Sequence, residues 1–306
     1  MEVNNSEIIT REMIAEDLRN AGIVRGDILN LKISLKSIGK VEGGADTVID
    51  ALLDVVGEEG TLVADSFVEP FPVFLRFMYK NRISDDSSLS YAGAITNAIT
   101  KRNDVFRATH PIQRFAAIGR YAKELTENFT AESEPYGFLK QMAQMEAKNI
   151  RIGGKDKVVG VGTTHVAICD LKLKQKKIAK GIYYKDSSGK IKFFRAGWAN
   201  GCPVGFNNLI DVFRENGKIF SEGKVGEAEC IVTSMKDTLA FEMELLKKDP
   251  SVFLCSNPTC HFCSFTWKAS KYTFFHAFRS ALSKKKIKKI INLTAVYLLG
   301  QYFPKH

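Results

Sequence analysis

Four potential metal ligands lie within nine residues toward the carboxyl-terminal end of the chain: Cys255, Cys260, His261 and Cys263. Thiolates and imidazoles are ligands that zinc prefers, and four of them close a tetrahedral site. The spacing Cys-x4-Cys-x2-Cys also occurs in plant-type iron–sulfur proteins, but these need a further cysteine downstream, and none follows Cys263. The fourth zinc ligand would be His261, Cys202 or Cys230. Because no second Cys-x2-Cys pair accompanies the loop, we expect reduced cysteines in a compact turn rather than a metal.

A second segment, residues 26–63, could bind an anion. Apolar residues alternate with polar ones over residues 27–34, which predicts a half-buried strand. Residues 48–56 have helical spacing, with Asp46 placed to cap the helix and Gly57 to end it, and residues 61–63 resume extended structure. The backbone N–H groups and the dipole of a helix N-terminus after a glycine-bearing loop suit a diphosphate. The same strand, loop and helix also occur as scaffold alone.

The chain has five histidines, at positions 110, 165, 261, 276 and 306. Histidine is the side chain best suited to accept a proton near neutral pH. His110 stands between Arg107 and Pro111, where its ring could instead bond the backbone at the entrance of a strand.

Composition predicts one sizeable globular domain. The chain has 306 residues, of which 45% are hydrophobic and 25% charged, and it shows no internal repeat. Its first residues are polar with no apolar stretch after them, so we expect no signal peptide. The six cysteines have no regular spacing, which is typical of a reducing compartment. We therefore expect a cytoplasmic protein.

The net charge of +10 belongs to the carboxyl-terminal end. Nine of the 44 basic residues and none of the 34 acidic ones lie in residues 264–306, which leaves the remainder nearly neutral. Residues 290–303 are largely apolar, but fourteen residues are too few to cross a bilayer as a helix. A basic segment of this kind suits an anionic membrane surface, or it packs as a helical pair on the domain. No zinc finger, RNA-binding signature or helix-turn-helix supports nucleic acid as a partner.

The amino-acid sequence of residues 26–63 resembles that of the aminoglycoside 3-N-acetyltransferase family. In that family the strand ends in His-Ser-Ser-Leu before a Gly-Gly loop and a similar helix. Three further segments match in order, at residues 88–95 (SLSYAGAI), 107–111 (RATHP) and 116–119 (AAIG). A looser match pairs a family Gly-Val-Gly and a later His-Leu-Ala-Glu with residues 160–162 and with His165-Val166-Ala167. The resemblance covers roughly residues 5–263 and is most specific through residue 120.

The resemblance implies an α/β fold with a mixed sheet flanked by helices in one catalytic domain, residues 1–263, followed by a basic helical tail, residues 264–306. It implies an acetyl-CoA-dependent N-acetyltransferase that acts on an amino group of an amino sugar, either an aminoglycoside or a surface-glycan precursor. The alternative is a catalytically retired relative that docks a glycan-assembly complex on the inner face of the membrane through the tail.

Roles for individual residues follow from the same resemblance. His165 would accept the proton, and a second alignment places Asp170 at this position. Asp156 or Asp170 would orient the ring, and His110 is a further catalytic candidate. The cofactor would be held by Lys32, Ser34, Leu35, Lys36, Ser37, Gly43 and Gly44. The departures from the family are Lys32-Ile33-Ser34 in place of His-Ser-Ser and Gln113-Arg114 after the His-Pro pair. Since amino sugars carry ammonium and hydroxyl groups, the acceptor would contact Asp65, Glu69, Asp85 and Asp86, with Tyr91 and Trp198 stacking on the sugar.

Overall fold

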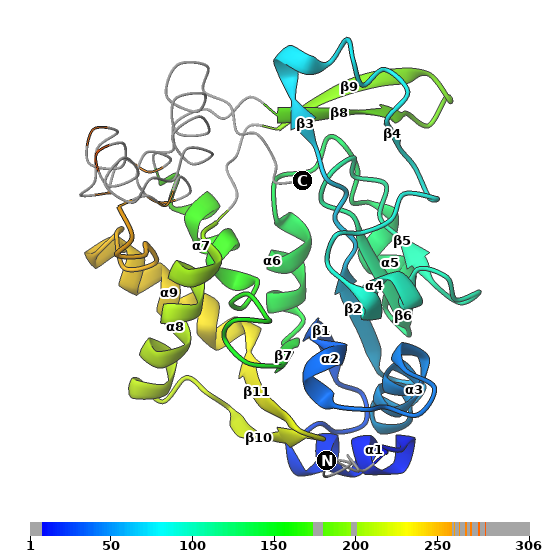
Figure 1. Ribbon diagram of the computed structural model, residues 1–306, viewed down its shortest axis with the longest axis vertical. Coiled ribbons are helices and arrows are strands. Elements are labelled where there is room, and N and C mark those ends of the chain that lie inside the picture. Colours follow the sequence, from blue (N-terminus) through cyan, green and yellow to red (C-terminus); the bar gives the residue numbers. More distant parts are fainter. Residues whose placement is uncertain are drawn as a thin grey trace, which may run out of the picture.

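The computed structural model describes residues 8–173, 180–196 and 201–258, together with Cys260, Cys263, Trp267, Ser270, Phe275 and Arg279 (Figure 1). The expectations for Trp198, for His261 and for most of the tail therefore lie outside the described residues. Among the described residues, no helix is both long and apolar enough to cross a membrane.

A mixed sheet of seven strands forms the centre of the molecule, in the order β10-β11-β7-β1-β2-β6-β5. Strand β1 is parallel to both of its neighbours, β7 and β2, whereas the outer pairs are antiparallel. These strands are β1 (Ile28–Ile33), β2 (Thr61–Asp65), β5 (Phe106–Arg107), β6 (Phe115–Gly119), β7 (Lys148–Ile152), β10 (Ser221–Val225) and β11 (Ala228–Ser234). The predicted α/β fold with a mixed sheet is confirmed.

A second, smaller sheet lies at the top of the molecule in Figure 1, at the opposite end from α1. It pairs strands that are distant in sequence: β3 (Phe71–Pro72), β4 (Ile83–Ser84), β8 (Lys180–Lys185) and β9 (Ile191–Ala196). The segment between β2 and α4 thus folds onto the chain between α7 and α8.

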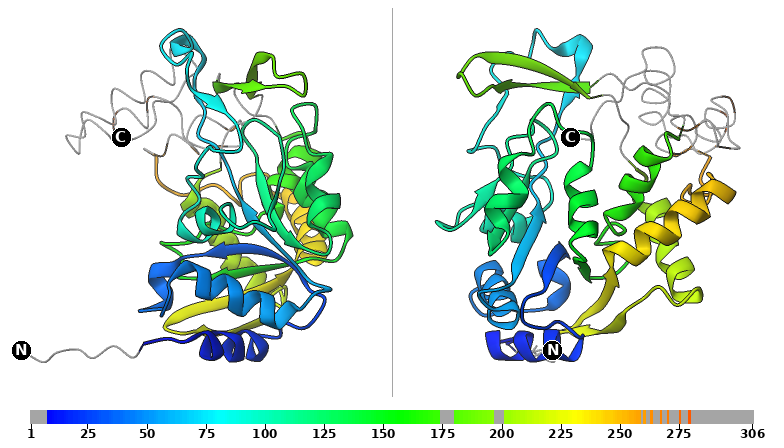
Figure 2. Two further views of the ribbon diagram at one scale, coloured as in Figure 1. Left: turned by 90° about the vertical axis from the view of Figure 1, so that its right-hand side faces the viewer. Right: turned by 180° about the vertical axis from the view of Figure 1, so that it is seen from behind.

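Helices cover both faces of the large sheet, as the two further views show (Figure 2). One hydrophobic core packs α1 (Arg11–Asn20), α3 (Ala45–Val56) and α4 (Ala94–Ile99) against one face. The other face packs against α5 (Ala122–Glu127), α6 (Gly137–Gln144), α7 (Thr163–Asp170), α8 (Pro203–Glu215) and α9 (Met235–Lys248). A short helix, α2 (Leu35–Ile38), follows β1 directly. The result is a three-layered arrangement of helices, sheet and helices.

The unit β1-loop-α3-β2 forms where the sequence predicts it. Gly57 ends α3 with a φ of 66°, in the left-handed region that glycine adopts without strain. The predicted cap is wrong, because Gly44 occupies the N-cap and Asp46 lies in the first turn. In that position its carboxylate still interacts favourably with the positive end of the helix dipole.

Strand β1 is buried along both faces over its first four residues, so the prediction of a half-buried strand is also wrong. Its polar position Asn30 does not face solvent. The Asn30 side-chain amide donates to the Asn149 carbonyl oxygen at 2.7 Å, and the Asn149 amide donates to the Thr233 hydroxyl at 3.4 Å. These residues are register partners on β1, β7 and β11, and they form a buried polar ladder across the sheet.

Beyond residue 263, Trp267 is buried against the domain. Its ring lies edge-on to Phe253, with centroids 4.9 Å apart, and 3% of the residue is exposed.

Candidate active site

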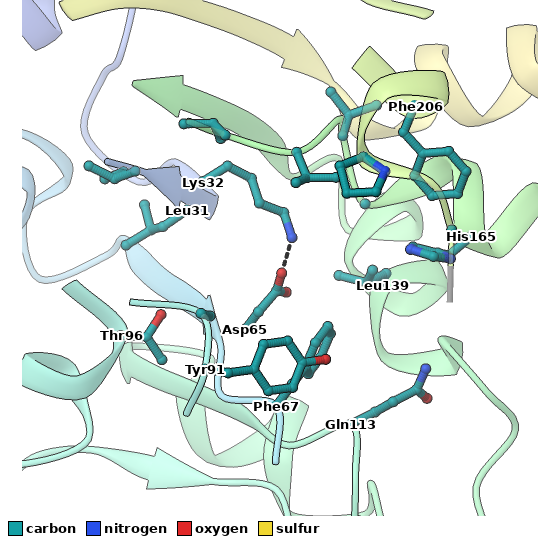
Figure 3. A pocket seen from close by; sticks show the side chains of 18 of the residues that line it. Leu31, Lys32, Asp65, Phe67, Tyr91, Thr96, Gln113, Leu139, His165 and Phe206 are labelled. Carbon is teal, nitrogen blue, oxygen red and sulfur yellow. Dashed lines mark hydrogen bonds and ion pairs between the residues drawn. The ribbon is translucent and has the colours of Figure 1, made fainter. Parts of the chain in front are cut away.

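A cavity of about 410 Å³ opens at the carboxyl ends of β1 and β2, a size typical of small-molecule sites. Its lining comes from β1, β2, α4, α6, α7 and α8 and from the loops at residues 91–92, 112–113 and 157–162. Figure 3 shows Lys32 and Asp65 pointing toward each other, with His165 and Phe206 on the other side of the cavity.

Lys32 and Asp65 form an ion pair at this edge of the sheet. The parallel register pairs Leu31 with Ala64, so the next residues along, Lys32 and Asp65, emerge side by side. Their side chains are 14% and 12% exposed. The second oxygen of Asp65, Oδ1, is buried without a hydrogen-bond partner in the described part of the chain. The carboxylate of Asp65 on β2 therefore balances the charge of Lys32 on β1.

His165 lies in the first turn of α7 between two aromatic rings. It stacks on Tyr136, with centroids 4.3 Å apart and planes within 4°, and Phe206 meets it edge-on at 4.7 Å. Burial, with smaller contributions from the charges of Lys32 and Lys180, lowers the pKa of His165 to about 3. The imidazole is therefore neutral at physiological pH and has a lone pair that can accept a proton.

In the described residues, no carboxylate is hydrogen-bonded to His165. Asp170 ends α7 and pairs with Lys140 at 2.8 Å, outside the cavity lining. Asp156 pairs with its neighbour Lys157 on the surface. The structure therefore brings neither of the predicted orienting acids to the ring.

His110 is fully buried and bonds the backbone, which agrees with the second of its two interpretations. Its Nδ1 accepts the N–H groups of Ile112 at 3.1 Å and Gln113 at 2.9 Å, and its ring stacks on Phe129. Burial lowers its pKa to about 4. The ring does not line the cavity, but it fixes the turn that carries Gln113, which does.

The predicted cofactor residues lie together around the end of β1, and of these Lys32 lines the cavity. Leu35, Lys36 and Ser37 belong to α2, and Ser34 is its N-cap. The Ser37 hydroxyl donates to that of Ser34 at 2.8 Å, and Gly43 and Gly44 have positive φ before α3. Their role in binding a cofactor stays a prediction.

Of the four acids predicted to contact the acceptor, Asp65 alone lines the cavity. Glu69 pairs with Arg82 at 3.7 Å, and Asp86 pairs with the buried Arg114. The side chains of Ser87 and Ser88 bond Asp85 and lower the pKa of its carboxyl group. The carboxylates of Asp85 and Asp86 thus stabilise the loop at residues 83–93.

Tyr136 and Phe206 are among the cavity residues that escape sequence reasoning. Gln113 stood out in the sequence only as a departure from the family; its side-chain oxygen accepts the backbone N–H of Tyr136 at 3.1 Å. Tyr136 has a φ of 61°, uncommon for a residue other than glycine, and no local pattern predicts it. Tyr91, predicted to stack on a sugar, does line the cavity.

A cluster of four cysteines adjoins the cavity. The sulfur atoms of Cys202, Cys255, Cys260 and Cys263 lie within 4.8 Å of one another. Of the three fourth ligands that the sequence left open, the structure brings in Cys202. Cys230 is instead buried on β11 within the sheet's core, and His261 is outside the described residues. This group of thiols could bind a metal ion.

Comparison with known proteins shows which family the chain belongs to and which solved structures share its fold. The family model for aminoglycoside 3-N-acetyltransferases matches residues 31–247. The chain belongs to this family of acetyl-CoA-dependent N-acetyltransferases. Aminoglycoside N(3)-acetyltransferase III from Salmonella sp is 24% identical over 274 residues, which span 78% of this chain and 92% of the relative. Aminoglycoside N(3)-acetyltransferase VII from Streptomyces paromomycinus is 31% identical over 157 residues, 47% of this chain and 54% of that protein.

Solved structures share the fold. YokD from Bacillus subtilis superposes with a TM-score of 0.68 at 23% identity, covering 80% of this chain and 96% of that one. AAC-IIIb, in a binary complex with CoASH, gives a TM-score of 0.64 at 20% identity, with coverage of 79% and 97%.

The neutral state of the two buried histidines predicts how stability depends on pH. In an unfolded chain histidine titrates near pH 6.5, whereas the folded pKa values are about 4 for His110 and about 3 for His165. Below about pH 6.5 the unfolded chain binds more protons than the folded one. The contribution of the two histidines to the folding free energy is therefore fully present above that pH and is lost as the pH falls. Each histidine contributes a slope of up to about 1.4 kcal/mol per pH unit.

We expect urea unfolding between about pH 5 and pH 6.5 to show a shallower slope of the unfolding free energy for His165→Gln than for the unaltered protein. The comparison between the two proteins is needed because Glu242, whose pKa burial raises to about 8, contributes a slope of the opposite sign to both. Identical slopes would contradict a neutral, desolvated His165.

Proposed function

We propose that the protein transfers the acetyl group of acetyl-CoA to an amino group of a singly charged or anionic amino sugar, such as a nucleotide-linked precursor of a surface glycan. The balance of charge in the cavity carries this proposal. Among the described lining residues, Asp65 is the single acid, and Lys32 and Lys157 are basic. Because aminoglycosides carry several ammonium groups, a cavity without surplus negative charge favours a different acceptor.

Acetyl transfer to an amine needs a deprotonated nitrogen next to the thioester carbonyl. The nitrogen–carbon bond forms, the carbon–sulfur bond breaks, and a proton passes from the nitrogen to the sulfur of the departing CoA. We assign the transfer of this proton to His165, whose ring lines the cavity and is unprotonated at neutral pH. Asp65, the single acid among the described lining residues, receives the incoming ammonium group, which loses one proton to solvent before the nitrogen attacks. Tyr91 and Phe67 offer aromatic surface to a sugar ring.

The cofactor approaches from the end of β1, beside α2 and the Gly43-Gly44 loop, where the dipole at the start of α3 favours an anion. A curated relative named an aminoglycoside N(3)-acetyltransferase and a similar structure holding CoASH support the reaction class. The competing hypothesis is a retired enzyme. Two departures from the family favour it, Lys32-Ile33-Ser34 in place of His-Ser-Ser and Gln113-Arg114 after the His-Pro pair.

Turnover tests the proposed reaction. With acetyl-CoA we expect release of free CoA thiol in the presence of a nucleotide-linked amino sugar and less with an aminoglycoside. His165→Ala should lower kcat by about 10² to 10⁴, the usual effect of removing a general base, and leave the affinity for acetyl-CoA within a few-fold. Asp170→Asn tests the second alignment, which places Asp170 instead of His165 at the position of the family histidine. Loss of turnover in Asp170→Asn with full turnover in His165→Ala would overturn the assignment.

We also propose that residues 264–306 form a tail that binds anionic membrane surfaces, next to the catalytic domain of residues 1–263, so that the enzyme works at the cytoplasmic face of the membrane. The nine basic residues without an acidic one support this, since each contributes about 1 kcal/mol near an anionic surface.

Vesicle sedimentation tests the tail. Full-length protein should sediment with vesicles that contain anionic lipid and return to the supernatant as salt rises, because salt screens surface charge. A protein truncated after Ser270 keeps the buried Trp267 and should stay in the supernatant. A full-length protein that ignores anionic vesicles at low salt would refute the membrane role.

A further inference from the structure

We propose that Cys202, Cys255, Cys260 and Cys263 bind a structural zinc ion that joins the start of α8 to the chain after α9. This differs from our sequence-based expectation of reduced cysteines in a turn. What changes the interpretation is the fourth thiol, which comes from a segment more than fifty residues away in the chain. The proposal is independent of the reaction that the protein performs.

The distances between the sulfur atoms suit a single tetrahedral ion. Zinc binds thiolates at about 2.3 Å, so four of them at the corners of a tetrahedron lie about 3.8 Å apart. The four Sγ atoms are all within 4.8 Å of one another, and Sγ of Cys260 is 3.6 Å from Sγ of Cys202. A shift of less than about 1 Å brings them to zinc geometry.

The surroundings of the sulfur atoms stabilise thiolates. The backbone N–H of Gly205 donates to Cys202 Sγ at 3.4 Å, and the N–H of Cys255 donates to Cys263 Sγ at 3.3 Å. Such donors orient metal ligands and spread their charge. Cys202 is also the N-cap of α8, where the helix dipole favours a negative charge.

Ordinary apolar packing does not account for the cluster. Cys202, Cys255 and Cys263 are 3%, 6% and 0% exposed, yet they form a small cluster of their own in which the other members are Leu254 and Cys260. The three larger cores, by contrast, consist mainly of aliphatic and aromatic side chains. All four cysteines are free thiols, so no disulfide explains their convergence.

The proposed zinc would hold one wall of the cavity. Gly201, Pro203 and Phe206, which flank Cys202 in the chain, line the cavity, and Phe206 meets the ring of His165. A side chain at Gly205 would collide with the backbone carbonyl of Phe253, so the two segments pack backbone against backbone. A metal that bridges Cys202 and Cys255 would fix this close approach.

Metal analysis of the full-length protein, purified without chelators and freed of any affinity tag, tests the proposal. We expect about one zinc per chain by elemental analysis. Cys202→Ser and Cys260→Ser should lose the zinc and melt at a lower temperature, because a structural zinc contributes directly to folding. Cys169→Ser is the matched control, since Cys169 is a partly buried free cysteine outside the cluster, and it should keep the metal.

Two measurements on the unaltered cysteines keep the test decisive if the serine variants do not fold. Replacement of zinc by Co²⁺ should give the intense visible absorption and thiolate charge-transfer bands of a tetrahedral sulfur site. Titration with a mercurial should release one zinc as about four thiols react, followed with a chromogenic zinc indicator. Zinc-free protein from zinc-supplemented cells, stoichiometric iron in place of zinc, or zinc retained by Cys202→Ser would each overturn the assignment.

Discussion

The register of β1 with its neighbouring strands determines where the candidate site lies. Asn30, Asn149 and Thr233 are hydrogen-bonded across β1, β7 and β11 inside the sheet, where no water can replace a lost partner. A slip of one residue would separate these side chains and leave their polar groups unpaired inside the sheet. The same strand β1 is in parallel register with β2, and that register sets Lys32 beside Asp65. The ladder thus fixes β1 against β7 and β11, and the β1–β2 pairing places the ion pair at the edge where the cavity opens.

The cavity combines balanced charge with aromatic walls. Lys32 and Asp65 neutralise each other, and His165, held between Tyr136 and Phe206, is uncharged at neutral pH. Under the proposed function, such a site would bind an acceptor through one polar anchor and contact with ring faces. Family membership assigns the reaction class, and the side chains of this cavity determine which acceptor fits.

The local sequence pattern predicted elements whose start and end depend on nearby residues, such as α3. The periodicity of residues 48–56 and Gly57 located α3, and the matched motifs identified the family. The alternation in β1 was misread, because a buried strand with a polar ladder has the same period as a half-exposed one. Asp85 and Asp86 have the right chemistry for an ammonium group, but the arginines and serines that engage them become neighbours only in the folded chain. Cys202 joins the other cysteines for the same reason, so sequence alone left three alternatives for the fourth ligand.

Binding of acetyl-CoA, measured by isothermal titration calorimetry on the full-length protein, tests the central claim most directly, because it separates an active enzyme from a retired relative without knowledge of the acceptor. The account predicts saturable binding of about one acetyl-CoA per chain with a Kd between about 1 μM and 1 mM, the range usual for enzyme substrates. The absence of any binding heat at millimolar acetyl-CoA, from protein that is shown to be folded, would contradict it.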